Sequence, residues 1–282
     1  MEKEYIRIIP KLEVKGPNLV KGIKLDGLRV LGNPENFALH YFNEGADEIF
    51  FQDVVASLYQ QNTLLSILKK VANNILIPIT AGGGVKTLSD IQNFLNAGAD
   101  RVSINSAIVS DFSFFKESIK KFGVSNIVVS VEAVKIKEKY MITIKSGREF
   151  TGIELNDWIK KINSVAPVEI FLTSVDMDGT GRGYDINMVS YLRNVKNSIV
   201  LVGGASNLRE IAEIIKKNKY INGIGIGSAL HYDTISHKKL KFDDTGNTEF
   251  LKHNIHKPKN LVTFSLKKIK SYLKQKKINI RN

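Results

Sequence analysis

The 282-residue chain contains no cysteine, and this absence removes several kinds of chemistry. Disulfide bonds, thiolate metal sites and a cysteine nucleophile are all excluded. The five histidines show no spacing typical of a metal site, so we predict neither a metal ion nor a cofactor; they are His40, His231, His237, His253 and His256.

Long apolar runs and the pattern of an export signal are also missing. No stretch of about 18 apolar residues occurs, which argues against a membrane span. Residues 1–4 lead directly into a strand-like run and lack the shape of a signal peptide. We therefore expect a cytoplasmic protein. Apolar residues are 43% and charged residues 24% of the chain, which is typical of a globular protein and not of a disordered one.

The formal net charge is +13, which raises the question of a nucleic-acid partner. Residues 233–282 hold 13 Lys or Arg against 4 Asp or Glu, so +9 of the +13 lies there. This stretch is either a solvated tail of biased composition or a surface for a polyanion or an acidic partner. Because no aromatic RNA-binding motif, zinc finger or basic zipper accompanies the charge, a scaffold that binds nucleic acid is the weakest hypothesis.

Eight short strand-like segments alternate with helical patterns. Apolar residues recur at helical spacing in the segments between the strands, and Leu266, Ile269 and Leu273 mark a last helix. Asn33 before Pro34, and Thr87 further on, are expected helix N-caps. The strands are expected at Tyr5–Pro10, Glu48–Gln52, Ile77–Thr80, Arg101–Ile104, Ile127–Val131, Glu169–Thr173, Ile199–Val202 and Gly223–Ile226.

Strands separated by helices predict a parallel sheet, and eight of each predict an α/β protein with one closed (β/α)8 barrel over residues 1–282. Two segments interrupt the alternation. Residues 135–151 are expected to form a hairpin insertion, and the polar residues 233–262 a surface insertion before the final helix.

The chain repeats itself at half its length. Glu48-Ile49-Phe50 recurs as Glu169-Ile170-Phe171 at an offset of 121 residues, and Ser106-Ala107 recurs as Ser228-Ala229 at an offset of 122. Such a long period indicates two similar half-barrels, so the active site should have approximate two-fold symmetry.

Two matched glycine turns follow strands and precede helices, at Gly82-Gly83-Gly84 and at Gly203-Gly204. Asn105-Ser106 and Gly227-Ser228 end the strands that come next. A strand, a glycine turn and a helix N-terminus together can bind an anion. The glycines could also serve the turns alone, but the matched pair favours two phosphate sites and a bis-phosphate ligand across the barrel mouth.

Acidic residues stand at the ends of strands. Glu13 and Glu132 belong to opposite strands, the first and the fifth, so they could act as an acid and a base on two sides of one substrate. Asp53 and Asp176 end the second and sixth strands, and we expect them to contact the substrate or its phosphates. The alternative is that these carboxylates only fix loops or cap the next helix.

Charged residues also lie at the strand starts, which form the floor of a barrel. Arg7, Glu48, Arg101 and Glu169 could make a ring of ion pairs there, which would be of interest as a gate. Ordinary surface pairs are the alternative.

These residues resemble the cyclase subunit family of imidazole glycerol phosphate synthase. The resemblance covers residues 6–232 and resumes at about 265–281. Its longest matches, around Ser103-Ile104-Asn105 and over 173–180, favour the cyclase over the isomerase of the same pathway, a sister half-barrel family that also binds two phosphates. The other matching segments are residues 7–15, 20–22, 45–48, 81–84 and 98–105.

The resemblance implies a lyase of histidine biosynthesis. Ammonia from a partner glutaminase, in a heterodimer, passes through the barrel to a ribulosyl bis-phosphate, which yields imidazole glycerol phosphate and aminoimidazole carboxamide ribotide. Glu13 and Glu132 map onto the acid and base, and Lys21 onto a lysine of a mobile first loop. The resemblance also implies that Arg7, Glu48, Arg101 and Glu169 form the ammonia gate, and that Asp100 lies at the glutaminase interface. The residues implied to contact the substrate or its phosphates are Gly83, Gly84, Ser103, Asn105, Ser106, Thr173, Gly179, Gly203, Gly204, Gly227 and Ser228.

The chain departs from the family at both catalytic positions, which are normally Asp. Glutamate reaches about one methylene further, whereas site groups must be placed within roughly 0.5 Å. A second hypothesis therefore stays open, in which a paralogue relays ammonia to an amidine-forming enzyme of surface-sugar synthesis.

Overall fold

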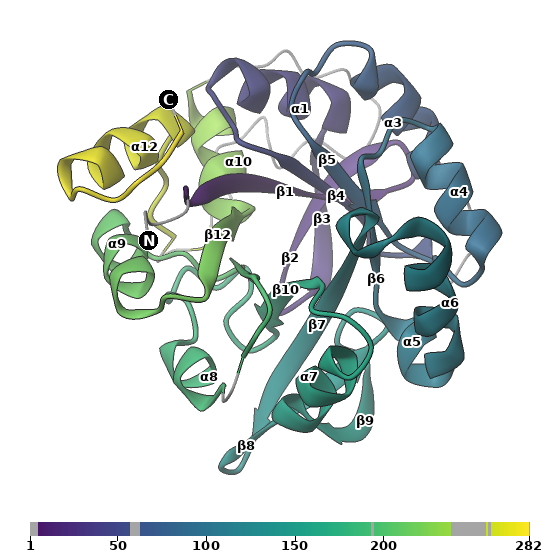
Figure 1. Cartoon of the computed structure of the whole chain (residues 1–282). Coiled ribbons are helices and arrows are strands. Elements are labelled where there is room, and N and C mark those ends of the chain that lie inside the picture. The colour runs from purple at the N-terminus through teal and green to yellow at the C-terminus, as the bar shows by residue number, and fades with distance from the viewer. Residues whose placement is uncertain (1–4, 57–62, 193–194, 238–257, 259–260, 282) are drawn as a thin grey trace.

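The computed structural model describes residues 5–56, 63–192, 195–237, 258 and 261–281. Its centre is a barrel of eight parallel strands, which the pairing of β10 with β7 closes (Figure 1). The predicted (β/α)8 barrel is thus confirmed. In order around the barrel the strands are β1 (Arg7–Lys15), β4 (Ile49–Asp53), β5 (Ile79–Gly82), β6 (Arg101–Ile104), β7 (Ile127–Ile136), β10 (Glu169–Ser174), β11 (Ile199–Val202) and β12 (Ile221–Ile226).

Helices pack around the outside of the barrel and begin where the sequence signals them. The Asn33 side chain accepts two backbone N–H groups at the start of α1 (Pro34–Asn43). Thr87 forms a capping box with Asp90 before α4 (Leu88–Asn96). The other helices are α3 (Thr63–Ala72), α5 (Ser106–Ser110), α6 (Phe112–Phe122), α7 (Leu155–Asn163), α8 (Ile186–Tyr191), α9 (Leu208–Lys217), α10 (Ser228–Ser236) and α12 (Leu266–Gln275).

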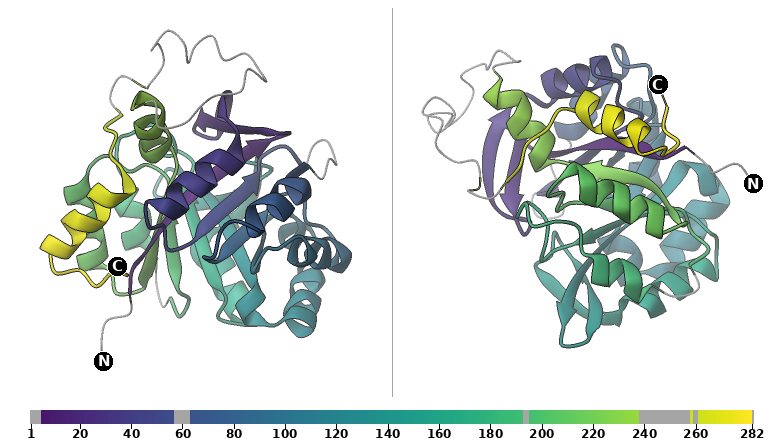
Figure 2. Two further views of the ribbon diagram at one scale, coloured as in Figure 1. Left: turned by 90° about the horizontal axis from the view of Figure 1, so that it is seen from above. Right: turned by 90° about the vertical axis from the view of Figure 1, so that its left-hand side faces the viewer.

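Two antiparallel additions extend the sheet at the end of the barrel where the strands finish. The first, β2 (Asn18–Ile23) and β3 (Asp26–Gly32), follows β1 and lies at the opposite end of the molecule from the start of β1 (Figure 2). The sequence analysis placed no strand there. The second is β8 (Lys139–Ile144) and β9 (Glu149–Glu154), which occupies the segment expected to hold a hairpin at 135–151.

Because of these additions, the first and fifth barrel strands end later than the sequence analysis predicted. Glu13 does not follow the first strand but lies within β1, opposite Val20 of β2, and Glu132 lies within β7, opposite Thr143 of β8. The antiparallel partners supply backbone hydrogen bonds beyond the barrel ladder, so β1 and β7 continue past the ends that apolar patterning indicates.

The start of segment 233–262 also differs from the predicted surface insertion. Residues 233–236 complete helix α10 instead of beginning an insertion. Residues 238–257 and 259–260 lie outside the described residues, so the rest of the expected insertion stays a prediction. Within the described ranges, none of the helices has the length and apolar character needed to cross a bilayer.

The last helix is tied to the barrel by one buried ion pair. Lys270 Nζ of α12 lies 2.7 Å from Asp47 Oδ1, and the other oxygen of Asp47 accepts the Ile8 N–H of β1 at 2.8 Å. Both charged side chains are more than nine-tenths buried. The pair therefore connects the C-terminal helix to the first strand.

We predict that Lys270→Met lowers the free energy of unfolding by about 3 kcal/mol, because it leaves the Asp47 carboxylate buried without its cation. Urea denaturation measures this loss. The exposed Lys267 on the same helix is the control, and Lys267→Met should change stability by less than about 0.5 kcal/mol. Equal midpoints for the two variants would contradict the prediction.

Candidate functional site

The four charged residues predicted at the strand starts form one network across the barrel floor. Arg7 Nη1 lies 2.7 Å from Glu48 Oε2, and Arg7 also contacts Glu169. Arg101 bridges the same two carboxylates, and Thr80 Oγ1 donates to Glu48 at 2.6 Å. Burial raises the pKa of Glu169, but Arg101 and Arg7 together bring it below its usual value. Each arginine of the ring thus contacts both carboxylates.

An apolar layer lies directly above this ring. Phe50 and Phe171, the residues two positions after Glu48 and Glu169, meet edge to face with ring centroids 4.8 Å apart. Alternate residues of a strand face the same side, so both phenylalanines point into the barrel as the two glutamates do. The layer consists of Ile9, Phe50, Val128, Phe171, Val200 and Val202.

Above the apolar layer, Glu13 lies in a cluster of buried charges at the barrel mouth. Lys21 Nζ is 2.9 Å from both carboxylate oxygens, and Lys11 Nζ is 2.9 Å from Oε1. Lys21 also contacts Asp178 Oδ2 at 2.7 Å. Burial raises the pKa of Glu13, but Lys11 and Lys21 outweigh it and lower the pKa to about 2. Glu13 is therefore ionised at neutral pH.

Glu132 meets a different environment on the opposite side of the mouth. It is 3% exposed and accepts the Gly147 N–H at 3.1 Å and a hydrogen bond from Gln52. Burial raises the pKa of Glu132, and the charge of Lys11 offsets this only in part. The two glutamates thus differ in proton affinity, which is the condition for assigning them different roles.

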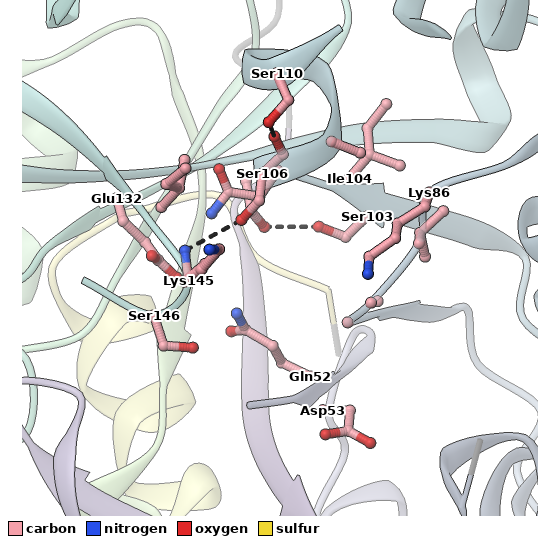
Figure 3. Close-up of a pocket in the computed structure, with 18 residues that line it drawn as sticks. Gln52, Asp53, Lys86, Ser103, Ile104, Ser106, Ser110, Glu132, Lys145 and Ser146 are labelled. Atoms are coloured by element: carbon pink, nitrogen blue, oxygen red, sulfur yellow. Dashed lines mark hydrogen bonds between the residues drawn. The ribbon is translucent and has the colours of Figure 1, made fainter. Parts of the chain in front are cut away.

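A cavity of about 440 Å³ opens between strands β5 and β6 and extends to Glu132 (Figure 3). Ser103 Oγ and Ser130 Oγ lie 2.6 Å apart in it, and Gly83, Gly84 and Asn105 form part of its wall. The turn between β8 and β9 covers one side, where the Lys145 N–H donates to Ser106 Oγ at 3.1 Å. Lys86 and Lys145 both line this cavity, and the Lys145 ammonium group is paired with Glu149 Oε1 at 2.6 Å.

The second predicted anion site lies on the opposite side of the mouth. Gly179, Gly203, Gly204, Gly227 and Ser228 surround a narrow cleft between the ends of β11 and β12. A neighbouring cavity of about 260 Å³ is lined by Gly179 and Ser228 and adds the side chains of Lys21 and Arg29.

Backbone geometry explains two of the glycines at these turns. Gly83 has φ +123°, and a Cβ atom there would lie 2.4 Å from the Asp53 carbonyl oxygen. Gly204 has φ +81°, and its Cβ atom would lie 2.3 Å from the Gly183 oxygen. Glycine is required at both positions, at equivalent points of the two half-barrels.

The helices that begin at these sites differ from their neighbours in how they start. Thr87 and Asn207 cap α4 and α9 with their side chains. Asn105 and Gly227, which precede α5 and α10, make no side-chain cap. The first N–H groups of α5 and α10 are thus left for an anion at the mouth.

Three predicted residues make contacts other than those of a substrate-binding group, and for Asp53 the contact is the capping role named above as the alternative. Asp53 Oδ1 accepts the N–H groups of Val55 and Ala56, so it caps the chain after β4, although it also borders the large cavity. Asp176 accepts the Lys135 N–H outside the mouth. Lys21 lies in strand β2 and is 4% exposed, rather than in a loop.

Sequence reasoning missed Lys11 and Asp178. Lys11 follows Arg7 and Ile9 in the alternation of inward-facing residues on β1, a signal that could have identified it. Asp178 lies in the loop after β10, where no periodicity distinguishes it from Asp176. Other cavity residues that were missed are Gln52, Lys86, Ser130, Lys145 and Ser146.

Two further predicted residues, Thr173 and Asp100, lie on a barrel strand and on the barrel floor. Thr173 is buried on β10 and pairs with Glu132 of β7 in the sheet register. Asp100 lies on the floor, exposed, and accepts the Ile79 N–H at 2.8 Å.

Comparison with known proteins finds one matching family model and relatives that share a single name. A family model described as histidine biosynthesis protein matches residues 7–236. The imidazole glycerol phosphate synthase subunit HisF of Natranaerobius thermophilus is 39% identical over 83% of this chain and 94% of its own length. The proteins of that name in Legionella pneumophila and Campylobacter concisus are 39% and 36% identical, over 73% and 88% of this chain and 98% and 95% of their own lengths.

We predict that Lys11→Met raises the pKa of Glu13 above about 2, because one of the two ammonium groups that favour its ionised form is removed. In the wild type the folded-state pKa lies below the unfolded value near 4.5, so Glu13 stabilises the fold above that pH. This stabilisation is lost as the pH falls towards 2, and Lys11→Met reduces it.

Carbon-13 NMR of the glutamate carboxyl groups, assigned with Glu13→Gln, measures this pKa. Lys15→Met, on the exposed end of the same strand, is the matched control and should leave the titration unchanged. An unaltered Glu13 titration in Lys11→Met would show that Lys11 does not set its charge state.

Proposed function

This chain belongs to the histidine biosynthesis protein family, and we propose that it is the cyclase subunit of an imidazole glycerol phosphate synthase. In this role it is a lyase of histidine biosynthesis, and it works with a glutaminase subunit in a heterodimer. The observation that carries the proposal is the pair of buried glutamates between two anion sites, above an apolar interior and a charged floor.

The two anion sites orient a bis-phosphate substrate. One phosphate binds at the β5–β6 turns, near Lys86 and Lys145, and the other at the β11–β12 turns, near Lys21 and Arg29. Because the sites lie on opposite sides of the mouth, the reacting part of the substrate lies between Glu13 and Glu132. Fixing both ends of the substrate removes much of the entropic cost of the reaction.

The interior of the barrel suits the delivery of neutral ammonia. An ammonium ion would have to leave water to enter the layer around Phe50 and Phe171, which costs several kcal/mol, whereas uncharged ammonia enters at much lower cost. Nitrogen that reaches the mouth is therefore unprotonated and nucleophilic.

The environments of the two glutamates assign their roles. Glu132, whose pKa is raised, is the group that exchanges protons with the substrate. Glu13 stays ionised and stabilises the positive charge that develops on nitrogen as ammonia adds to the ribulosyl carbon. The pairing of Glu13 with Lys11 and Lys21 fixes the longer glutamate side chain in one position.

The alternative role, a relay of ammonia to an amidine-forming enzyme, finds no support among the relatives reported above, which carry the name of the synthase subunit. The cytoplasmic location and the absence of a cofactor stay predictions.

We expect the purified chain to turn over the ribulosyl bis-phosphate with ammonium salt alone. Glu132→Gln should lower kcat by about 100-fold or more, because proton transfer by a positioned side chain typically contributes that much. The assay follows loss of substrate absorbance. Glu138→Gln, on the exposed β7–β8 turn, is the control and should retain full activity. A wild-type chain that binds the substrate without converting it would refute the proposal.

A further inference from the structure

His231 is a buried histidine near the start of α10 that the proposed reaction does not use. Its side chain is 0% exposed. The Nε2 atom lies 2.9 Å from the carbonyl oxygen of Lys11 on β1, and the Nδ1 atom lies 2.7 Å from the hydroxyl oxygen of Tyr41 on α1. Phe37 meets the imidazole edge to face, with ring centroids 5.7 Å apart. This one side chain therefore joins α1, α10 and β1.

The two hydrogen-bond partners fix which nitrogen of the His231 ring carries the hydrogen. A carbonyl oxygen can only accept, so Nε2 carries the hydrogen and donates it to Lys11. Burial and the charge of Lys21 lower the pKa of His231 to about 4, so the ring holds a single hydrogen at neutral pH. Nδ1 therefore accepts from the Tyr41 hydroxyl, and burial raises the pKa of Tyr41, which keeps that hydroxyl protonated.

The carbonyl that His231 binds belongs to the part of β1 that carries the charged cluster. The register of β1 with β12 ends at the pair of Pro10 and Ile226, and the Lys11 carbonyl follows directly after it. Lys11 Nζ lies 2.9 Å from Glu13 Oε1, so a shift of the Lys11 backbone moves both charged side chains. An apolar ring at position 231 would fill the same space but would leave the carbonyl without this donor. The histidine therefore does more than pack.

The same hydrogen bond lies beside the second predicted anion site. Gly227, which precedes α10, lines the narrow cleft of that site. A Cβ atom on Gly227 would lie 3.5 Å from the Lys11 carbonyl oxygen, 3.6 Å from Lys21 Cε and 3.7 Å from His231 Nε2. The backbone N–H of His231 also donates to the Gly227 carbonyl at 3.0 Å. His231 thus connects the turn of the anion site to the strand that carries Glu13.

We propose that His231 is a positioning residue: its Nε2–H tautomer, held by Tyr41, fixes β1 against the α10 turn and so sets Glu13 relative to the bound phosphate. The inference rests on the proposed function, in which a phosphate at this turn and Glu13 act on one substrate. Groups of a functional site must be placed within roughly 0.5 Å. A displacement of about 1 Å costs about 100-fold in rate, so the loss of this hydrogen bond should be seen in kcat.

The tautomer is tested first, in the absence of substrate. Nitrogen-15 NMR of the imidazole groups, with the His231 signals assigned by means of His231→Gln, distinguishes a ring nitrogen that carries hydrogen from one that does not. We expect hydrogen on Nε2 and none on Nδ1 at neutral pH. A His231 ring with hydrogen on Nδ1 alone, or on both nitrogens, would overturn the inference.

The positioning role is tested with a double variant, His231→Phe with Tyr41→Phe. It removes both hydrogen bonds, keeps an aromatic ring at each position and leaves no tyrosine hydroxyl buried without a partner. Replacing both partners by apolar groups is nearly neutral for stability, so the melting temperature should stay near that of the wild type. We expect KM for the ribulosyl bis-phosphate to stay near the wild-type value while kcat falls about 100-fold.

Two further variants complete this test. His231→Gln keeps a side-chain N–H that can donate to the Lys11 carbonyl, and it should recover most of the lost kcat. His237→Phe replaces an exposed histidine at the end of the same helix and should retain full activity. A double variant with wild-type kcat would overturn the inference, and so would a fall in kcat matched by equal losses of thermal stability and substrate binding, because that pattern indicates a purely structural role.

The wild-type measurement separates this inference from the proposed function. A wild-type chain that binds the bis-phosphate but does not turn it over with ammonium salt would refute the proposed function. An active wild type together with an equally active double variant would refute the role of His231 alone.

Discussion

A charge inside a closed barrel can be neutralised only by other side chains that point into the same barrel. Parallel strands direct every second residue inward, and the barrel leaves little room for water around them. Among the described residues, the inward-facing ion pairs form two groups, the ring of Arg7, Glu48, Arg101 and Glu169 at the floor and the cluster around Glu13 at the mouth. Each cation contacts a carboxylate, so each group holds its side chains in fixed positions.

The apolar layer between these groups keeps them independent. Phe50 and Phe171 fill the middle of the barrel, and Arg101 lies over the Phe171 ring with its guanidinium carbon 5.9 Å from the centroid. The half-length repeat builds this arrangement twice, because Glu48-Ile49-Phe50 and Glu169-Ile170-Phe171 each supply one carboxylate and one aromatic ring. A duplicated strand thus produces both the floor ring and the layer above it.

Much of this organisation could be predicted from the sequence, because strand periodicity is local. Once β1 is located, Arg7, Ile9, Lys11 and Glu13 follow as inward-facing residues, and the eight barrel strands were all found. Features that depend on distant contacts could not be predicted. Strand β2 forms because β1 pairs with it, and the choice of Asp178 over Asp176 depends on where Lys21 lies, which the sequence of the loop after β10 does not indicate.

The direction of the helices accounts for the electrostatic difference between the two ends of the barrel. In the described part of the chain the covering helices start near the mouth and end near the floor, so helix N-termini, with their partial positive charge, surround the proposed substrate site. At α5 and α10, where no side chain caps the first turn, that charge is available to phosphate. The same helix dipoles are negative at the floor, where lysines end α3, α6, α7 and α9. One geometric rule, the parallel order of strands and helices, therefore places the proposed anion sites at one end of the barrel and these lysines at the other.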